Sequence, residues 1–284
     1  MSPWATVRDV EYKSVPDAFT YVRCGACGSL SLENPPMDRL DVIYPKTSYS
    51  FGEASGFVHR IKDRLDGRWF RSMTRSLPGD RLSALDIGGG TGHQLATLRR
   101  AEPRIVRSVV VDLDEGARNA AIAGGHEYVR ARIEDADVRG PFDVVLLLNL
   151  IEHVADPLAV LRRVRSLASP GAVVLVKTPN IDSLDARLFR HRNWGGYHCP
   201  RHWALFTPES FMRTARSAGF EIRSWQFTQG APFWAVSTLA LLDSLGMARI
   251  DSARPAWQHP LYAPLAAGFA AFDFLRRPLS SLSQ

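Results

Sequence analysis

Apolar residues follow two different patterns along this chain. Between residues 52 and 73 they recur at every fourth position, which predicts one apolar stripe on a helix. That stripe consists of Phe57, Ile61, Leu65, Trp69 and Met73. Farther along, short apolar runs alternate with amphipathic segments, as in a parallel sheet covered by helices on both faces. The fold predicted is therefore α/β, with a doubly wound, mostly parallel sheet.

The boundaries of these elements follow from the same pattern. The predicted strands span residues 82–87, 105–112, 127–130, 142–149, 172–177 and 220–227. The predicted helices that connect them span residues 93–101, 115–123, 157–167 and 208–218. Asp156 is a suitable N-cap, and Pro157 suits the first helical position that follows it. The run Ser169-Pro170-Gly171 predicts a turn that ends this helix before the next strand.

The last fifty residues are unusually apolar and predict two helices, at residues 233–247 and 257–275, joined by a proline-containing linker. Asp243 interrupts the first helix, and Pro260 and Pro264 interrupt the second, whereas a membrane-spanning helix needs about 20 apolar residues. This tail is a candidate lid, homodimer face or peripheral membrane contact. The chain is therefore expected to comprise an N-terminal extension (1–51), a catalytic domain (52–230) and an apolar helical tail (231–284).

Composition narrows the setting more than the chemistry. The 284 residues are 45% hydrophobic and 23% charged, as in an ordinary globular protein. The charged first twenty residues lack the apolar core of a signal peptide, and three cysteines are too few for a secreted disulfide framework, so a cytoplasmic location is expected. The net charge of +6 is compatible with nucleic acid, an anionic membrane or an anionic substrate, but the spacing of the arginines favours a solvated helix surface.

A glycine-rich turn follows the first predicted strand of the sheet. The strand carries Asp86 near its end, and Gly88, Gly89, Gly90 and Gly92 come directly after it. Glycines allow a ligand to lie against the backbone, which indicates a nucleotide-type ligand. A dinucleotide fingerprint requires glycine at the sixth position, which is His93 here, and a phosphate-binding P-loop requires a lysine that this turn lacks. The remaining arrangement, an acid two residues before the first glycine, suits a ligand with a positive amino group and a sulfonium.

The second strand of the predicted sheet ends in another acidic residue, Asp112, twenty residues after Gly92. A carboxylate at this position can accept hydrogen bonds from both hydroxyls of a ribose. Asp112 can alternatively cap the helix that begins at Glu115, but Asp114 is better placed for that role.

These motifs resemble class I S-adenosylmethionine-dependent methyltransferases, over roughly residues 52–227. By this resemblance the fold is Rossmann-like, the cofactor is S-adenosyl-L-methionine, and the glycine turn binds it. Its contacts are expected to be Asp86, Gly88, Gly89, Gly90, Asp112 on the ribose, Leu113 on the adenine, Ile133 through its backbone, Asn149 and Leu150. Arg132 stands where such enzymes usually have an acid near the adenine, so Glu134 is an alternative to Ile133.

Two further stretches resemble particular branches of that class. FDVVLLLNLIEHVADP (142–157) is similar to quinone-biosynthesis methyltransferases. KTPNIDSL (177–184) and the long segment 194–222 resemble the branch associated with sugars, polysaccharides and secondary metabolites. The resemblance implies O-methylation of a sugar or natural product, with a small-molecule acceptor that is possibly anionic or glycosylated. An RNA-directed methyltransferase, or a cofactor-binding protein without transfer activity, are the alternatives.

Three histidines are candidates for the base that a hydroxyl acceptor requires: His153, His198 and His202. Each also has a structural interpretation, as a side chain that orients a turn or holds a loop. Trp194, Tyr197 and Arg201, in the same loop as His198 and His202, are expected to contact the acceptor.

Cys24 and Cys27 have the spacing of half a zinc knuckle, and related proteins often have an earlier second pair that is absent here. Structural zinc requires four ligands. Only Cys199 or a histidine remains to complete such a site, so a degenerate knuckle is expected and no metal is assigned.

Overall fold

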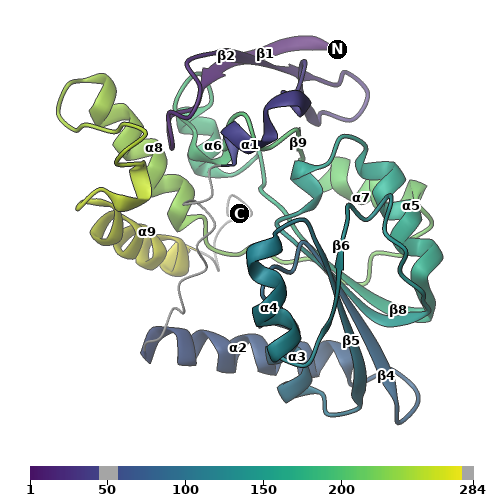
Figure 1. Cartoon of the computed structure of the whole chain (residues 1–284). Helices are drawn as coiled ribbons and strands as arrows, with labels where there is room; N and C mark the ends of the chain where they lie inside the picture. The colour runs from purple at the N-terminus through teal and green to yellow at the C-terminus, as the bar shows by residue number, and fades with distance from the viewer. Residues whose placement is uncertain (45–56, 277–284) are drawn as a thin grey trace. The chain divides into compact units, whose positions relative to one another are not determined.

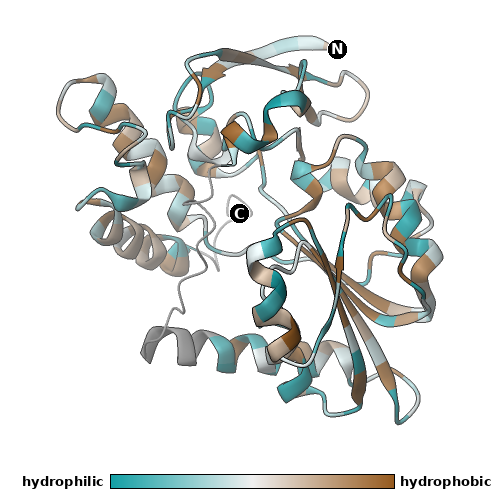
Figure 2. Cartoon of the chain, viewed as in Figure 1, coloured by the Kyte–Doolittle hydropathy of each residue, from teal (hydrophilic) through white to brown (hydrophobic). Residues whose placement is uncertain are grey.

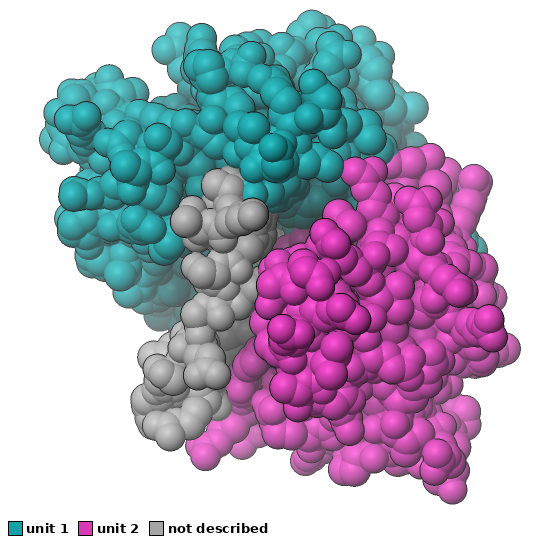
Figure 3. Space-filling view, in the orientation of Figure 1, with its two compact units in different colours: residues 1–49, 152–155, 178–284 teal, residues 50–151, 156–177 magenta. Residues whose placement is uncertain are grey.

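The computed structural model describes residues 1–44 and 57–276, and its residues form two compact units (Figure 3). The parallel-sheet unit comprises residues 50–151 and 156–177, and the antiparallel-sheet unit comprises residues 1–49, 152–155 and 178–284. This division groups the chain differently from the three parts expected from the sequence. The expected boundary between residues 51 and 52 lies outside the described residues.

The parallel-sheet unit contains a five-stranded sheet in the order β6-β5-β4-β7-β8, with every neighbouring pair parallel (Figure 1). Its strands are β4 (Leu82–Ile87), β5 (Ile105–Asp112), β6 (Glu127–Arg130), β7 (Phe142–Leu148) and β8 (Ala168–Lys177). Its helices are α2 (Phe57–Thr74), α3 (His93–Ala101), α4 (Glu115–Ala123) and α5 (Pro157–Leu167). The predicted α/β fold with a doubly wound parallel sheet is confirmed.

Both faces of this sheet are buried, which explains why its strands are continuous apolar runs. Ala84, Val110 and Val144 belong to one core cluster that also contains residues of α2, α3 and α4. Their strand neighbours Leu85 and Val145 point to the other face and are fully buried as well. Figure 2 shows the strands of this sheet in predominantly hydrophobic colours.

The predicted stripe on the first helix is only partly correct. Trp69 and Met73 pack against the core cluster, and Phe70, which is not in the stripe, is 1% exposed. Leu65 is 56% exposed. The side chains of Phe57 and Ile61 lie outside the described residues, as do residues 52–56 of the predicted helix.

The ends of α5 differ in how well the sequence predicts them. The Asp156 carboxylate accepts a hydrogen bond from the Ala159 amide at 2.9 Å, and Pro157 stands in the first turn, as predicted. The predicted turn at Ser169-Pro170-Gly171 is wrong, because β8 begins directly at Ala168. The register between β7 and β8 shifts after Phe142, and Gly171 has a φ of 79°. The glycine thus accommodates an irregularity inside the strand rather than a turn before it.

The antiparallel-sheet unit contains a four-stranded sheet in the order β1-β2-β3-β9. Its strands are β1 (Ser2–Arg8), β2 (Ala18–Arg23), β3 (Leu30–Leu32) and β9 (Ala204–Leu205). Its α-helices are α1 (Leu40–Ile43), α6 (Leu184–Phe189), α7 (Pro208–Ser217), α8 (Ala231–Ser244) and α9 (Tyr262–Arg276). The 3-10 helices are η1 (Met37–Arg39), η3 (Gly195–Tyr197) and η4 (Ala256–Gln258), and η2 (Ile151–His153) begins at the last residue of the parallel-sheet unit.

The predicted strand at residues 220–227 is wrong. This segment has no regular secondary structure, and Trp225 is 60% exposed. The Phe220 amide donates to the Ala215 carbonyl at 3.0 Å and so closes the end of α7, with Gly219 at a φ of 87°. Its apolar residues therefore follow a helix cap and do not form a strand face.

The two helices of the apolar tail are present as α8 and α9, which pack against each other. The first also packs on η3, where the Gly195 amide donates to Ser237 Oγ at 2.8 Å. No helix among the described residues is long and apolar enough to cross a membrane. The packing of α8 on η3 makes the tail part of the fold of this unit.

Candidate active site

The glycine turn lies at the carboxyl end of β4, beside the point where the strand order of the sheet reverses. The Gly88 amide donates to the Val111 carbonyl of β5 at 2.8 Å, so the turn is tied to the neighbouring strand. Gly88 has a φ of 74°, and a Cβ added there would lie 2.9 Å from Leu150 Cδ1. Ligands of doubly wound sheets bind at this edge.

Asp86 lies directly beneath the turn. Its side chain is buried at 2% exposure, and a Cβ added to Gly89 would approach its Oδ2 to 2.6 Å. Among the described residues, Oδ2 has no hydrogen-bond partner. Burial, with a smaller effect from the charge of Asp112, raises the pKa of Asp86 to about 8. A buried acid of this kind favours a ligand that brings a positive charge.

Asp112 holds the turn from β5. Its Oδ2 accepts from the Gly90 amide at 2.8 Å, and its Oδ1 accepts from the Asp114 amide at 2.9 Å. Asp114, not Asp112, caps α4 by accepting from the Gly116 amide at 2.8 Å. Since each carboxylate oxygen accepts more than one hydrogen bond, Asp112 keeps capacity for ribose hydroxyls.

The other predicted cofactor contacts have different exposures. Leu113 is 53% exposed, so its side chain is accessible to a flat ligand, whereas Ile133 is buried. Asn149 leaves the end of β7 with a φ of 56° and donates its amide to the Lys177 carbonyl at 2.9 Å. Leu150 is the residue that faces Gly88.

The three candidate bases converge within the antiparallel-sheet unit. The ring centroids of His153 and His202 lie 4.6 Å apart, those of His198 and His202 4.9 Å, and those of His153 and His198 6.1 Å. Glu152 and His153 come from η2, and the other two histidines follow η3. The sequence singles out each histidine, but only the structure brings them together.

His198 differs from the other two because it is paired with a carboxylate. Its Nδ1 lies 2.6 Å from Glu11 Oε2, and the two side chains are 16% and 15% exposed. Because a carboxylate accepts, Nδ1–H donates, and Nε2 is left with a free electron pair. Glu11 is a residue that sequence reasoning missed, since it lies 187 positions away and belongs to no motif.

His153 and His202 are held by backbone carbonyls. His202 Nδ1 lies 2.8 Å from the Gly196 carbonyl, and His153 Nδ1 lies 3.1 Å from the Arg201 carbonyl and 3.0 Å from Tyr44 Oη. Burial, and then the neighbouring histidines, lower the pKa of His153 to about 3 and that of His202 well below its usual value. Both rings are therefore neutral at physiological pH.

Trp194, Tyr197 and Arg201 are core residues of this unit, at 1%, 2% and 0% exposure. Trp194 Nε1 donates to Asp185 at 2.8 Å, and Tyr197 Oη donates to the Arg190 carbonyl at 2.6 Å. Their burial favours a role in shaping the loop over the direct acceptor contact expected from the sequence.

The Arg201 guanidinium is fully used within the protein. It donates to Asp9 Oδ2 at 3.1 Å and to Ser14 Oγ at 3.0 Å, and it stacks on Tyr12 at 4.2 Å. Burial alone would raise the pKa of Asp9, but the Arg201 charge and its hydrogen bonds hold that pKa below the usual value. This pair fixes the His198–His202 loop to the N-terminal strands, because a buried charge that loses its partner is strongly destabilising.

The cysteine pair lies in the turn between β2 and β3, which its own backbone closes. The Gly28 amide donates to the Cys24 carbonyl and the Cys24 amide to the Ser29 carbonyl, both at 2.9 Å. Cys199 is buried in the apolar core of the unit, where burial raises the pKa of its thiol. In the part of the chain that the structure describes, no group of three metal-ligating side chains includes a cysteine.

Comparisons with known proteins agree with this arrangement. The family model described as methyltransferase domain matches residues 58–224, more than half of the chain. The ubiquinone biosynthesis O-methyltransferase of Cereibacter sphaeroides is 30% identical over 175 residues, which cover 57% of this chain and 69% of the relative. That of Caulobacter vibrioides is 33% identical over 130 residues, which cover 42% of this chain and 50% of the relative.

Among solved structures, the plantazolicin methyltransferase BpumL in complex with SAH has a TM-score of 0.47 and 17% identity, over 66% of this chain and 77% of that one. A sugar N-methyltransferase from Streptoalloteichus has a TM-score of 0.34 and 27% identity, over 44% of this chain and 55% of that one. The parallel sheet, its glycine turn and the family match together establish the class and the methyl donor. The chain belongs to the methyltransferase domain family and is a class I methyltransferase that uses S-adenosyl-L-methionine to methylate small molecules.

Proposed function

We propose that this enzyme methylates a hydroxyl oxygen of a sugar or natural product, with His198 as the general base. The observation that carries the proposal is the His198–Glu11 pair, because a hydroxyl acceptor must lose a proton and a carboxylate-bound imidazole is suited to take it. The curated relatives named ubiquinone biosynthesis O-methyltransferase support oxygen as the methylated atom.

The cofactor residues of this proposal all belong to the parallel-sheet unit. Asp86 is assigned to the positive end of the cofactor and Asp112 to its ribose, since one carboxyl group is buried beneath the turn and the other holds it from β5. Leu113 is assigned to the adenine and the Ile133 backbone to its edge. The glycine turn and Leu150 line the remaining contact, with Asn149 at the end of β7.

The transfer itself is a displacement that requires alignment and one proton transfer. The acceptor oxygen forms a bond to the methyl carbon while the bond from that carbon to sulfur breaks, and the electron pair stays on sulfur. The acceptor proton moves to His198 Nε2 and from there to solvent. Glu11 keeps the ring in the required tautomer and stabilises the imidazolium that results.

Two finer features of the acceptor and its surroundings are also proposed. An anionic or glycosylated acceptor is supported by Arg187 and Arg192, which are exposed near η3. A homodimer or a peripheral membrane contact through the tail is supported by Leu245, Met247 and Leu275, at 63%, 72% and 74% exposure.

The direct test is transfer from isotopically labelled S-adenosylmethionine to three acceptor sets: catechols and other phenols, free and nucleotide-linked sugars, and RNA. Mass spectrometry identifies the methylated atom. Methylation of a hydroxyl in one of the first two sets is expected. Methylation of RNA alone would replace the proposal with an RNA-directed enzyme, and cofactor binding without transfer to any acceptor would favour a binding protein.

Asp86 gives a prediction about protons. Because the pKa of Asp86 in the free protein is about 8, most molecules carry a neutral Asp86 at pH 7, and a cationic ligand favours the ionised form. Cofactor binding at pH 7 is expected to release close to one proton, and affinity is expected to rise as the pH approaches 8. Titration calorimetry in buffers of different ionisation enthalpy measures this release. Equal release by Asp86→Asn would contradict the assignment.

The same pKa predicts the stability of the free protein. The folded pKa of Asp86 is raised above the unfolded value, so the folded state retains a proton that the unfolded state loses. This stabilising contribution is complete below about pH 4 and is lost as the pH rises through about 8. Asp86→Asn is therefore expected to be more stable than the natural protein at pH 9, with a smaller difference at pH 6. Urea denaturation at the two pH values measures both free energies of unfolding.

A further inference from the structure

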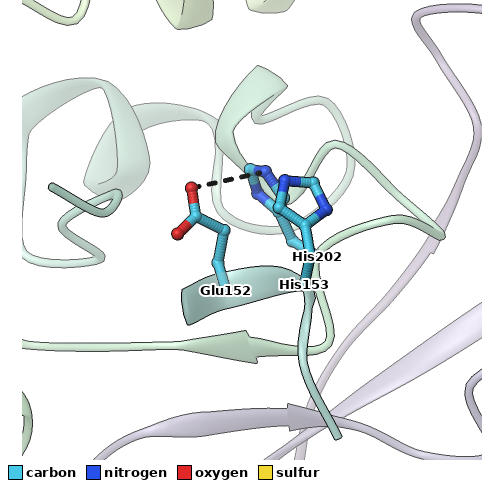
Figure 4. Close-up of side chains that lie close together, drawn as sticks. All are labelled: Glu152, His153 and His202. Carbon is cyan, nitrogen blue, oxygen red and sulfur yellow. Dashed lines mark ion pairs between the residues drawn. The ribbon is translucent and has the colours of Figure 1, made fainter. Parts of the chain in front are cut away.

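Three side chains with metal-ligating atoms converge in the antiparallel-sheet unit: Glu152, His153 and His202. One ligand-type atom of each lies within 4.8 Å of those of the other two, and His202 Nε2 is 4.0 Å from Glu152 Oε1. Figure 4 shows the Glu152 carboxylate directed toward the His202 ring, with the His153 ring beside it. Glu152 and His202 are buried at 1% and 4% exposure.

The backbone orients both imidazoles for binding through Nε2. A carbonyl oxygen only accepts, so the contacts of His202 Nδ1 with Gly196 and of His153 Nδ1 with Arg201 place the ring proton on Nδ1. Each Nε2 then carries a free electron pair. Metal-binding histidines usually donate their second nitrogen in this way to a carbonyl or carboxylate, which fixes the tautomer and the direction of the ring.

The two segments that carry these side chains are also tied together. The Trp203 amide donates to the Glu152 carbonyl at 2.6 Å, so the residue after His202 is bound to the main chain of Glu152. The ligand atoms therefore sit on backbone whose spacing is set. Donor atoms around a tetrahedral zinc ion lie about 3.4 Å apart, given bond lengths of about 2.1 Å. Small side-chain rotations bring the observed 4.0 Å to that spacing.

We propose that Glu152, His153 and His202 form a binding site for a divalent transition-metal ion, zinc being the favoured occupant. Two imidazole nitrogens and one carboxylate oxygen are a ligand set that zinc and its neighbours accept, and three protein ligands leave a coordination position open. The cysteine pair expected to be without metal is a separate feature, in the turn between β2 and β3. The site goes beyond the methyl transfer proposed above and does not depend on the acceptor.

The test uses the full chain, freed of metal by chelator and dialysis, with Zn²⁺ as the probe. Titration calorimetry and elemental analysis are expected to give one zinc per chain. Glu152→Gln and His202→Gln are expected to weaken zinc binding by about 100-fold or more, since even residues that merely orient metal ligands are worth 10- to 100-fold. The Cys24→Ser/Cys27→Ser double variant is the matched control and is expected to bind zinc as the natural protein does.

Absorption spectra of the Co²⁺ form provide a measurement that needs no variant. Nitrogen and oxygen ligands are expected, without the thiolate-to-metal charge-transfer bands that a cysteine site produces. Circular dichroism of each apo variant establishes that it is folded. Absence of stoichiometric zinc in the natural protein, thiolate bands, or zinc binding lost in the cysteine variant and kept in His202→Gln would each overturn the proposal.

Discussion

Replacing His198 by asparagine is expected to lower turnover about 10²- to 10⁴-fold, the range that a general base contributes. Asparagine is the suitable substitution because His198 has a φ of 39°, a left-handed conformation that asparagine adopts more readily than alanine. The cofactor dissociation constant is expected to stay unchanged, since the proposed cofactor contacts lie in the parallel-sheet unit. Steady-state kinetics with the best acceptor from the panel, and calorimetry with S-adenosylhomocysteine, measure the two quantities.

Two further variants separate catalysis from folding. Glu11→Gln keeps the size of the side chain but removes the charge that orients His198, so a smaller loss of turnover is expected. His191→Asn changes an exposed histidine shortly before the loop and is expected to leave turnover unchanged. A loss of only a few fold in His198→Asn would assign the base elsewhere or indicate catalysis by alignment alone.

Asp112→Ala is expected to weaken cofactor binding about 10²- to 10⁴-fold. Two hydrogen bonds from ribose hydroxyls to a charged acceptor contribute about 1.5 to 3 kcal/mol each, and every 1.4 kcal/mol corresponds to about tenfold in affinity. The substitution also frees the Gly90 amide that Asp112 holds at 2.8 Å, which adds to the loss because the turn is no longer fixed. Calorimetry with S-adenosylmethionine and with S-adenosylhomocysteine measures the change.

Asp156→Ala is the matched control for this experiment. It removes the helix cap of α5, at a cost of about 1 kcal/mol in folding free energy, from a position outside the glycine turn. Unchanged affinity in this control, with chemical denaturation to compare the stability of the two variants, separates a direct contact from general destabilisation. Near-natural affinity of Asp112→Ala would remove the ribose assignment.

Local sequence determined most of the parallel-sheet unit. The bounds of β4, β5 and β6, and of α3, α4 and α5, match those predicted from apolar periodicity and capping residues. These signals act over a few residues, so they can be interpreted without knowing what packs nearby. The glycine turn is predictable for the same reason, since the positive φ angles of Gly88 and Gly90 are requirements of their own positions.

The errors occur where a neighbour far along the chain decides the outcome. Residues 220–227 have the composition of a strand but no partner strand among the described residues, and their first amide closes α7. The N-terminal strands were not predicted as a sheet because β3 is completed by β9, more than 170 residues later. A strand is stable only when another strand accepts its hydrogen bonds, and the sequence does not state which one will.

The sequence by itself thus determined the α/β architecture, the family resemblance and the identity of the three histidines as candidates. Only the tertiary structure decided what each histidine can do. It paired His198 with Glu11 across 187 positions, committed Arg201 to Asp9 across 192, and set His202 beside Glu152 and His153. The physical reason is that tautomer, burial and charge are properties of an environment assembled from distant segments, and no local pattern encodes which segments will meet.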